Sequence, residues 1–376
     1  MVPFDAEKLM ALMEQAGVDL VLACTRHNIR YLTGGYFYHF HARFTRLGTS
    51  QYLPFVGIPR GRLADSFYIG TTGERGALEV HGLWIAQRFE TARSTVSAAA
   101  QAAALARQLG AGTGRIGVEM AFLPADAYLT LQRDLPHATL VDATDLFDEL
   151  RAIKTPAELA HLRSVYDRTA ASLCAAFQHG RPGLTTRQMA DHVRLEMEQR
   201  GLHFLWVFTN AGPGFLRAPS ETPWQPGHTL HLDAGGEDGD YLSDICRMGC
   251  LGEPSPLARE LHAACLAVQD AVRRELRPGL PCGAVQVLGD EAVKASPFAA
   301  YGRFVAHGIG MVSHEQPVIQ PGNERPLAAG MVLSIETEFR HPEVGHVKIE
   351  DAVAITPTGC EGLGDQGREW QIVPPP

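Results

Sequence analysis

One segment, HTLHLDAGGEDGDYLSDICRMG over residues 228–249, constrains the fold more than any other. Two β-like runs flank Asp238-Gly239, a dipeptide that tolerates positive φ and suits a two-residue type I′ hairpin turn. Counting outward from that turn predicts that Asp233 lies directly opposite Asp244. Directly opposed Cβ atoms lie about 4.5–5.5 Å apart, so two like charges there repel unless a cation lies between them. The segment predicts a metal site or, if the turn lies elsewhere, two ordinary solvated strand-end residues.

The carboxylate arrangement recurs in SIETEFRHPEVGHVKIEDAVAIT, residues 334–356. A three-residue loop at 342–344 would place Glu336 opposite Glu350 across a second hairpin. Between the two hairpins, FVAHGIGMVSHEQP carries His307 and His314 on either side of a Gly-rich stretch that permits close backbone approach. A single His is often a satisfied core residue, but two beside two carboxylate hairpins indicate a functional site.

Four carboxylates and one imidazole form a coherent set of metal ligands. Their four formal negative charges balance two divalent cations, and oxygen-rich ligation with one His favours Mn²⁺, Co²⁺ or Fe²⁺ over a thiolate-type zinc site. Two such ions can lower the pKa of a shared water and stabilise charge during hydrolysis. The ligand set therefore predicts metal-assisted hydrolysis, whereas Cys246 and Cys250 are interpreted as reduced core thiols.

Length and local patterns predict two domains. The chain has 376 residues, enough for two to three compact units. Helix-like and strand-like stretches alternate over 1–150, which predicts an α/β domain. Thr155, Pro156 and Glu158 form an N-cap, a first-turn proline and a capping-box acid, so a long helix is expected from 156 to about 179. The boundary is placed just before it, giving 1–150 and 151–376, with further helices at 185–201 and 255–277 and a strand-rich last third.

Composition excludes several classes of function. The chain has 33 Lys and Arg against 42 Asp and Glu, a formal charge of −9, which offers no basic footprint for nucleic acid or anionic lipid. No stretch approaches the ~20 uncharged apolar residues needed to cross a bilayer. The seven cysteines show no CxxC spacing, which suits a reducing compartment. We therefore expect a soluble cytoplasmic protein with no nucleic-acid or membrane partner.

The five candidate ligands closely resemble, in order and spacing, the pattern of the pita-bread metallopeptidases, the superfamily of methionine aminopeptidase, aminopeptidase P, prolidase (Xaa-Pro dipeptidase) and creatinase. RHNIRYLTG (26–34) and LRAIKTPAELAHLR (150–163) resemble the N-terminal signature and the linker helix of the prolidase and creatinase branch. The resemblance implies a creatinase-like α/β N-terminal domain, an α+β pita-bread catalytic domain, and a homodimer. It also implies two divalent metal ions; manganese is expected, with cobalt, iron or zinc as alternatives.

The resemblance also implies a role for each residue. Asp233 and Asp244 would bind one metal, His307 with Glu336 would complete the other site, and Asp244 and Glu350 would bridge the two. Glu336 would shuttle a proton from the bridging water. His314 would donate a hydrogen bond to the substrate or tetrahedral intermediate, unless it is simply a polar residue satisfied inside the sheet.

Departures from the family pattern fall on positions that contact substrate. Proline-specific members have a His in an NAxxPHY-like segment, where NAGPGFLRAP here has Phe215 and Leu216. Lys348 replaces the Arg expected before IED and loses bidentate carboxylate pairing. Glu336-Thr337-Glu338 replaces the usual Glu-Pro-Gly. These changes indicate a retained metal core with an altered substrate-binding shell.

The leading hypothesis is a dinuclear-metal hydrolase of a peptide or amide C–N bond, Xaa-Pro dipeptidase-like, acting on a small molecule or dipeptide. The alternative is a non-peptidase of the same fold, a creatinase-like amidinohydrolase or a dimethylsulfoniopropionate lyase-like enzyme, acting on a small charged metabolite. A binding protein without activity is disfavoured by five intact ligands.

The aromatic and His-rich segment TGGYFYHFHARF (33–44) allows two interpretations. It packs in the core of the N-terminal domain, because aromatic side chains carry large burial energies. Alternatively, as the creatinase branch implies, His39, His41 or a neighbouring Tyr contributes to the substrate pocket of the partner subunit.

Overall fold

The computed structural model describes residues 2–41 and 52–374. The chain divides into two compact units, Met1–Leu150 and Arg151–Pro376. Within the described ranges, no helix is long and apolar enough to cross a membrane.

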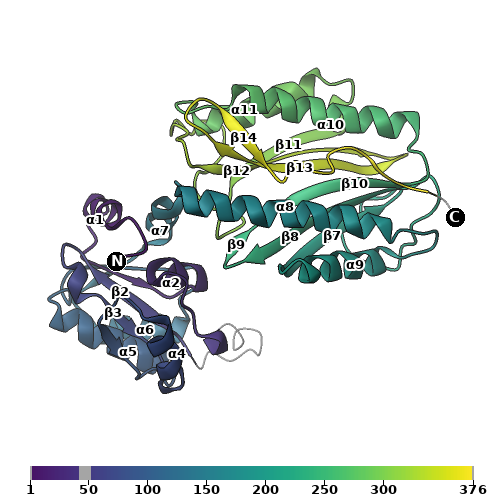
Figure 1. Ribbon diagram of the computed structural model, residues 1–376. Helices are drawn as coiled ribbons and strands as arrows, with labels where there is room; N and C mark the ends of the chain where they lie inside the picture. The colour runs from purple at the N-terminus through teal and green to yellow at the C-terminus, as the bar shows by residue number, and fades with distance from the viewer. Residues whose placement is uncertain (1, 42–51, 375–376) are drawn as a thin grey trace. The chain divides into compact units, whose positions relative to one another are not determined.

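The first unit is an α/β domain built on a mixed six-stranded sheet of order β4-β3-β2-β1-β5-β6 (Figure 1). β1 pairs antiparallel with β2 and parallel with β5. The strands are β1 (Leu20–Ala23), β2 (Phe55–Pro59), β3 (Phe67–Ile69), β4 (Gln87–Phe89), β5 (Arg115–Val118) and β6 (Thr139–Asp142). The helices are α1 (Ala6–Gln15), α2 (Arg26–Thr33), α4 (Arg75–His81), α5 (Thr95–Gln108), α6 (Ala125–Asp134) and α7 (Thr144–Arg151).

Alternation along β1 shows why this sheet is covered on both faces. Leu20 and Leu22 pack in a cluster with residues of α5 and α6. Val21 and Ala23 point to the other face and pack in a cluster with residues of α1, α2, α4 and α7. The continuous apolar run of β1 is therefore a central strand with helices on both sides, as predicted for an α/β domain.

The described residues of the second unit form four long helices. α8 (Pro156–Gln178) begins as predicted: the Thr155 side chain accepts a hydrogen bond from the Glu158 amide, and the Glu158 carboxylate accepts one from the Thr155 amide. α9 (Thr186–Gln199) and α10 (Pro256–Glu275) also confirm the expected helices. α11 (Cys282–Ala295) was not predicted, because its region was interpreted only as strand-rich.

These helices flank a nine-stranded sheet whose main path has the order β11-β12-β13-β10-β8-β7. β14 pairs with β13, β15 with β10 and β9 with β8. The strands are β7 (His203–Ala211), β8 (Thr229–Asp238), β9 (Tyr241–Leu242), β10 (Ile245–Leu251), β11 (Gly302–Gly308), β12 (Val332–His341), β13 (Gly345–Ile355), β14 (Cys360–Leu363) and β15 (Gln371–Val373).

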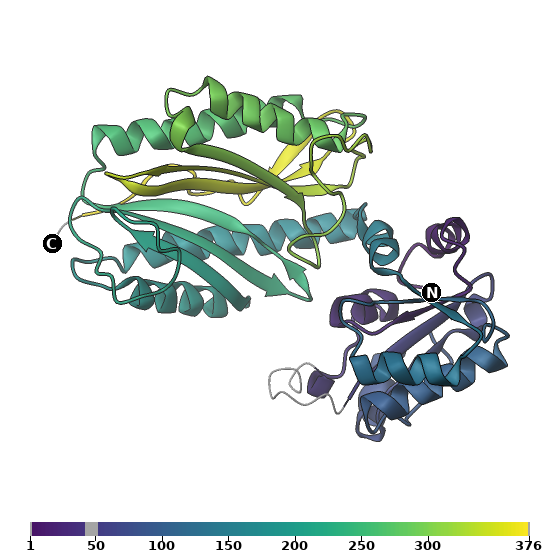
Figure 2. The same cartoon turned by 180° about the vertical axis from the view of Figure 1, so that it is seen from behind.

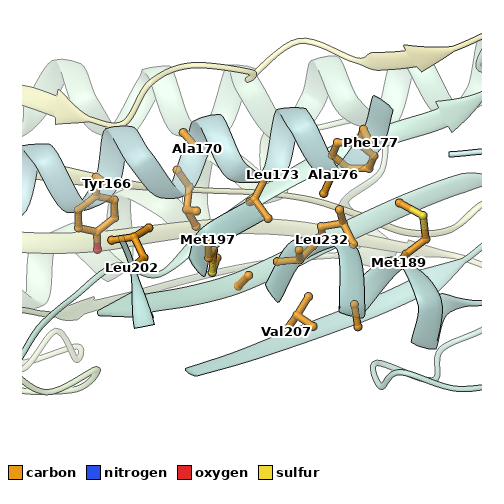
Figure 3. Packing of buried hydrophobic residues seen from close by; sticks show 14 of the residues in the cluster. Tyr166, Ala170, Leu173, Ala176, Phe177, Met189, Met197, Leu202, Val207 and Leu232 are labelled. Atoms are coloured by element: carbon orange, nitrogen blue, oxygen red, sulfur yellow. The ribbon is translucent and has the colours of Figure 1, made fainter. Parts of the chain in front are cut away.

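Two apolar clusters hold the sheet of the second unit against its helices. One joins α8 and α9 to β7 and β8, and Figure 3 shows several of its labelled side chains, among them Leu173, Phe177 and Leu232, packed between helices and strands. The other joins α10 and α11 to β11, β12 and β13. Figure 2 shows the two helix pairs, green and teal, along opposite sides of the strands. Because side chains alternate along a strand, the residues between these apolar positions share the opposite face.

The first carboxylate hairpin differs from its prediction in register. The turn is Gly239-Asp240, with φ of +57° and +71°, rather than Asp238-Gly239. Both central residues of a type I′ turn need positive φ, and Asp tolerates this conformation. Moving the turn by one residue shifts the pairing by two, so Asp233 pairs with Cys246 instead of Asp244. A shift of two keeps Asp233 and Asp244 on the same face, as diagonal neighbours.

The second carboxylate hairpin has the predicted register. His341 pairs with Gly345 around the three-residue loop, and Glu336 lies opposite Glu350. Gly345 adopts a φ of +92°, and a Cβ there would collide with the backbone carbonyl of Gly212, so this position requires glycine.

Candidate metal centre

Strand alternation gathers the five predicted ligands on one face of the second sheet. Asp233 on β8 lies on the face opposite the cluster of α8 and α9, and His307 on β11, Glu336 on β12 and Glu350 on β13 lie on the face opposite the cluster of α10 and α11. Asp244 immediately precedes β10. Asp233, Asp244, His307 and Glu350 are at least nine-tenths buried, and the Glu336 side chain is 16% exposed. The structure therefore brings together all five side chains that the sequence singled out.

The Lys348 side chain also lies within this group of carboxylates. Its Nζ is 2.7 Å from Asp233 Oδ2, 2.7 Å from Glu336 Oε2 and 2.7 Å from Glu350 Oε2, and the residue is 3% exposed. Sequence reasoning assigned Lys348 to substrate binding. The structure places its ammonium in contact with three of the candidate metal ligands.

A second cation contacts the same cluster from the segment after β7. Arg217 Nη2 is 2.5 Å from Asp233 Oδ2, and its guanidinium lies over the Phe208 ring, 5.2 Å from the centroid. Sequence reasoning passed over Arg217, although it directly follows the altered Phe215-Leu216 positions. Asp233 is thus paired with two side-chain cations.

The remaining ligand atoms fit a divalent cation. Ligand atoms of Asp244, His307 and Glu350 lie within 4.8 Å of one another. Asp244 Oδ1 is buried and has no hydrogen-bond partner among the described residues, and the buried His307 Nε2 lies 3.4 Å from Glu336 Oε1 without a hydrogen bond. Buried polar atoms without partners are costly, and two carboxylates with one imidazole suit Mn²⁺, Fe²⁺, Co²⁺ or Zn²⁺.

The pKa shifts of the carboxyl groups also indicate a site for a cation. Burial, together with the charges of Glu350 and Asp233, raises the pKa of Asp244 well above its ordinary value. Burial and the neighbouring Glu336 raise the pKa of Glu350 to about 7. Burial alone would raise the pKa of Glu336, but the Lys348 ammonium and the His307 ring lower it to about 2. The carboxylates nearest Asp244 therefore resist ionising together unless further positive charge is present.

His314 lies beside the centre on the loop after β11. Its ring stacks on that of His307, with centroids 4.0 Å apart; His314 is exposed, whereas His307 is buried. Partial burial and the His307 ring lower its pKa, so the imidazole is neutral near pH 7. The next residue, Glu315, anchors the loop: its carboxylate lies 2.8 Å from Lys154 Nζ and 3.3 Å from Arg151 Nη2.

Phe215 and Leu216, the predicted substrate-contacting positions, are 52% and 56% exposed. The Phe215 ring meets the His346 ring edge-on at 5.6 Å, and His346 lies 5.2 Å from His231. Both histidines are fully buried and were missed by sequence reasoning. The sequence spacing could have identified them. His231 precedes Asp233 by two residues and His346 precedes Lys348 by two, and residues two apart on a strand share a face.

The aromatic segment of the first unit surrounds a buried carboxylate. Glu74 accepts hydrogen bonds from Tyr36 and Tyr68, and His41 Nε2 lies 3.4 Å from Glu74 Oε1. His41 is 4% exposed, as the core-packing interpretation expects, whereas His39 is exposed. Residues 42–44 of the segment lie outside the described residues.

Comparison with known proteins identifies the class of fold and site. Residues 160–357 match the metallopeptidase family M24, and residues 6–153 match the creatinase/prolidase N-terminal domain. The chain belongs to metallopeptidase family M24, in its prolidase and aminopeptidase P branch, and is a metal-dependent hydrolase.

Individual relatives match from about two thirds to nearly all of the chain. An uncharacterized peptidase of Bacillus subtilis, YqhT, is 25% identical over 98% of this chain and 99% of its own. A Xaa-Pro dipeptidase of Lactobacillus delbrueckii subsp. lactis is 28% identical over 68% of this chain and 72% of its own. The solved structure of a Xaa-Pro dipeptidase from Bacillus anthracis superposes with a TM-score of 0.84 at 22% identity, covering 98% of each chain. The two-domain creatinase and pita-bread architecture expected from sequence is thereby confirmed.

Proposed function

We propose that this protein hydrolyses the C–N bond of a dipeptide or a small amide, using a divalent metal at Asp244, His307 and Glu350, with Xaa-Pro dipeptidase the nearest named activity. The observation that supports this proposal is that these three buried ligand side chains lie close together. Glu336 contacts His307, and the His314 ring stacks on the His307 ring. A bound divalent ion supplies Lewis acidity and lowers the pKa of water. Manganese is the expected metal.

The neighbouring side chains provide proton transfer and positioning. Glu336 is ionised at neutral pH because of Lys348, so it accepts the proton of the attacking water and passes it to the leaving nitrogen. His314, neutral and exposed, donates a hydrogen bond to the oxygen that gains charge as the carbonyl becomes tetrahedral. The Glu315 pairs hold the His314 loop in place.

A substrate screen with metal control tests this proposal. Chelator-stripped protein is reloaded with Mn²⁺ and assayed against Xaa-Pro dipeptides, other dipeptides and small amides. We expect C–N hydrolysis that chelation abolishes and Mn²⁺ restores. Activity insensitive to chelation, or no cleavage of any C–N bond in the panel, would contradict the proposal.

The apolar surface at Phe215 and Leu216 favours a second candidate, a non-peptidase acting on a small charged metabolite. A peptide carboxylate brought there finds no hydrogen-bond partner from these side chains, at a cost of roughly 1–3 kcal/mol. Ordinary Xaa-Pro dipeptides should therefore turn over below the ~10⁵ M⁻¹s⁻¹ of good enzymes. Betaines and guanidino compounds in the same screen separate the two candidates, since an aromatic face at Phe215 suits a cation.

A homodimer is also proposed, as the resemblance to the creatinase branch implies. His39 is the exposed histidine of the aromatic segment and is the candidate for contact with a partner's substrate pocket. Sedimentation of the protein, together with the KM of a His39→Ala variant, tests both statements. A monomer with an unchanged KM would contradict them.

A further inference from the structure

The arrangement of Lys348 bears on how many metal ions the centre holds. Its ammonium contacts one oxygen each of Asp233, Glu336 and Glu350 at the same 2.7 Å. This is the position in which a cation bridging those three carboxylates would lie. β13 carries the side chain inward between its neighbours on the sheet face, and at 3% exposure it has no solvent-facing position in this structure.

The formal charges of the cluster indicate how many divalent ions it can balance. Asp233, Asp244, Glu336 and Glu350 carry four formal negative charges when ionised. Lys348 and Arg217, both in contact with Asp233, offset two of them. The two remaining negative charges match one divalent ion, whereas the carboxylates alone would match two.

The ligand atoms that no fixed cation contacts lie on one side of the cluster. Asp233 Oδ2 contacts two cations, whereas Asp244 Oδ1 has no hydrogen-bond partner among the described residues and His307 Nε2 lies 3.4 Å from Glu336 Oε1. Together with Glu350 they form the only group of possible metal ligands found among the described residues, and Asp233 is not a member. A second divalent ion at Asp233 would lie close to two fixed positive charges and be repelled.

We propose that the Lys348 ammonium takes the place of one metal ion, so that this protein binds a single divalent ion at Asp244, His307 and Glu350. The sequence-based expectation of two ions counted the four carboxylate charges but not the positive charges of Lys348 and Arg217. The inference rests on the metal dependence stated in the proposed function, but it concerns the number of ions and not the substrate.

Counting bound ions tests it without an activity assay. Stripped protein is titrated with Mn²⁺ by calorimetry, the metal-to-protein ratio is measured after gel filtration, and the electron paramagnetic resonance spectrum is recorded. We expect about one ion per chain and the spectrum of an isolated Mn²⁺. Lys348→Met removes the charge at similar size, and should raise the count to about two with an exchange-coupled spectrum.

A matched control makes the result specific. Lys294→Met removes an exposed lysine of α11 and should leave the count near one. Two ions in the wild-type protein, or one ion in both wild type and a folded Lys348→Met variant, would overturn the inference. If Lys348→Met does not fold, the wild-type count and spectrum alone decide. No bound ion at all would instead overturn the proposed function, so the two failures are distinguishable.

Discussion

Two buried carboxylate sites in the second unit deal with negative charge in opposite ways. Glu315 is one carboxylate held by two fixed cations, Arg151 and Lys154, and all three side chains are at most 2% exposed. The candidate metal centre has four carboxylates against two fixed cations, Lys348 and Arg217. The first site is saturated by the chain itself, whereas the second has negative charge left for an exchangeable cation.

The difference separates a structural site from a functional one. A buried charge needs a partner of opposite sign, because desolvation otherwise costs several kcal/mol. At Glu315 every partner is covalently part of the protein, so the site can only hold the fold together. At the metal centre, part of the compensation must come from outside, which couples the site to ligand binding.

The largest expected effect comes from removing a ligand at the unsaturated site. Asp244→Ala should lose bound metal and lower kcat by more than the ~10²–10³ caused by losing a single hydrogen-bond donor. Metal content and steady-state rates measure this. Glu343→Ala, which removes an exposed carboxylate from the β12–β13 loop, is the matched control and should change neither quantity. Full metal content in Asp244→Ala would contradict the assignment.

Breaking the saturated site should affect stability instead. Glu315→Gln leaves two buried cations without a carboxylate, so we expect a loss of about 3–5 kcal/mol in the free energy of unfolding. Urea denaturation of the full chain measures it, with exposed Glu324→Gln as control. A loss below about 1 kcal/mol, the range of surface pairs, would show that the site is not needed for stability.

A smaller effect is expected at the residue between the two sites. His314→Ala should lower kcat about 10²–10³-fold while metal content stays constant, because the side chain acts on the charged intermediate and not on the ion. His137→Ala, an exposed histidine of the first unit, serves as control. An unchanged kcat would show that His314 is a polar residue with a structural role and no role in catalysis.

The smallest effect concerns acid stability. Burial would raise the pKa of Glu315, but Lys154 and Arg151 outweigh it and hold the pKa below the ordinary 4.5. As the pH falls, Glu315 is therefore protonated in the unfolded chain at a higher pH than in the folded protein. Its contribution to the free energy of unfolding is fully present above pH 4.5 and is lost as the pH falls toward the folded pKa. The stability difference between wild type and Glu315→Gln should shrink on acidification, by at most about 1.4 kcal/mol per pH unit. A difference that does not change with pH would contradict the depressed pKa.

Much of the fold was predictable because its signals are local. The capping box at Thr155 and the apolar run of β1 depend on residues within a few positions of each other. The β12–β13 register followed from its loop length. The β8–β10 register did not, because the sequence allowed two neighbouring turn positions, and a shift of one residue in the turn changes every pair by two.

The sequence by itself determined which residues are candidate ligands and which sheet face they share, since order and alternation are properties of neighbouring residues. Only the tertiary structure decided where the compensating cations lie. Arg217 and Lys348, which both contact Asp233, are 16 and 115 residues from it in the sequence. Lys154 is 161 residues from its partner Glu315. Such contacts depend on how distant strands and loops pack, because charge is compensated through space and not along the chain.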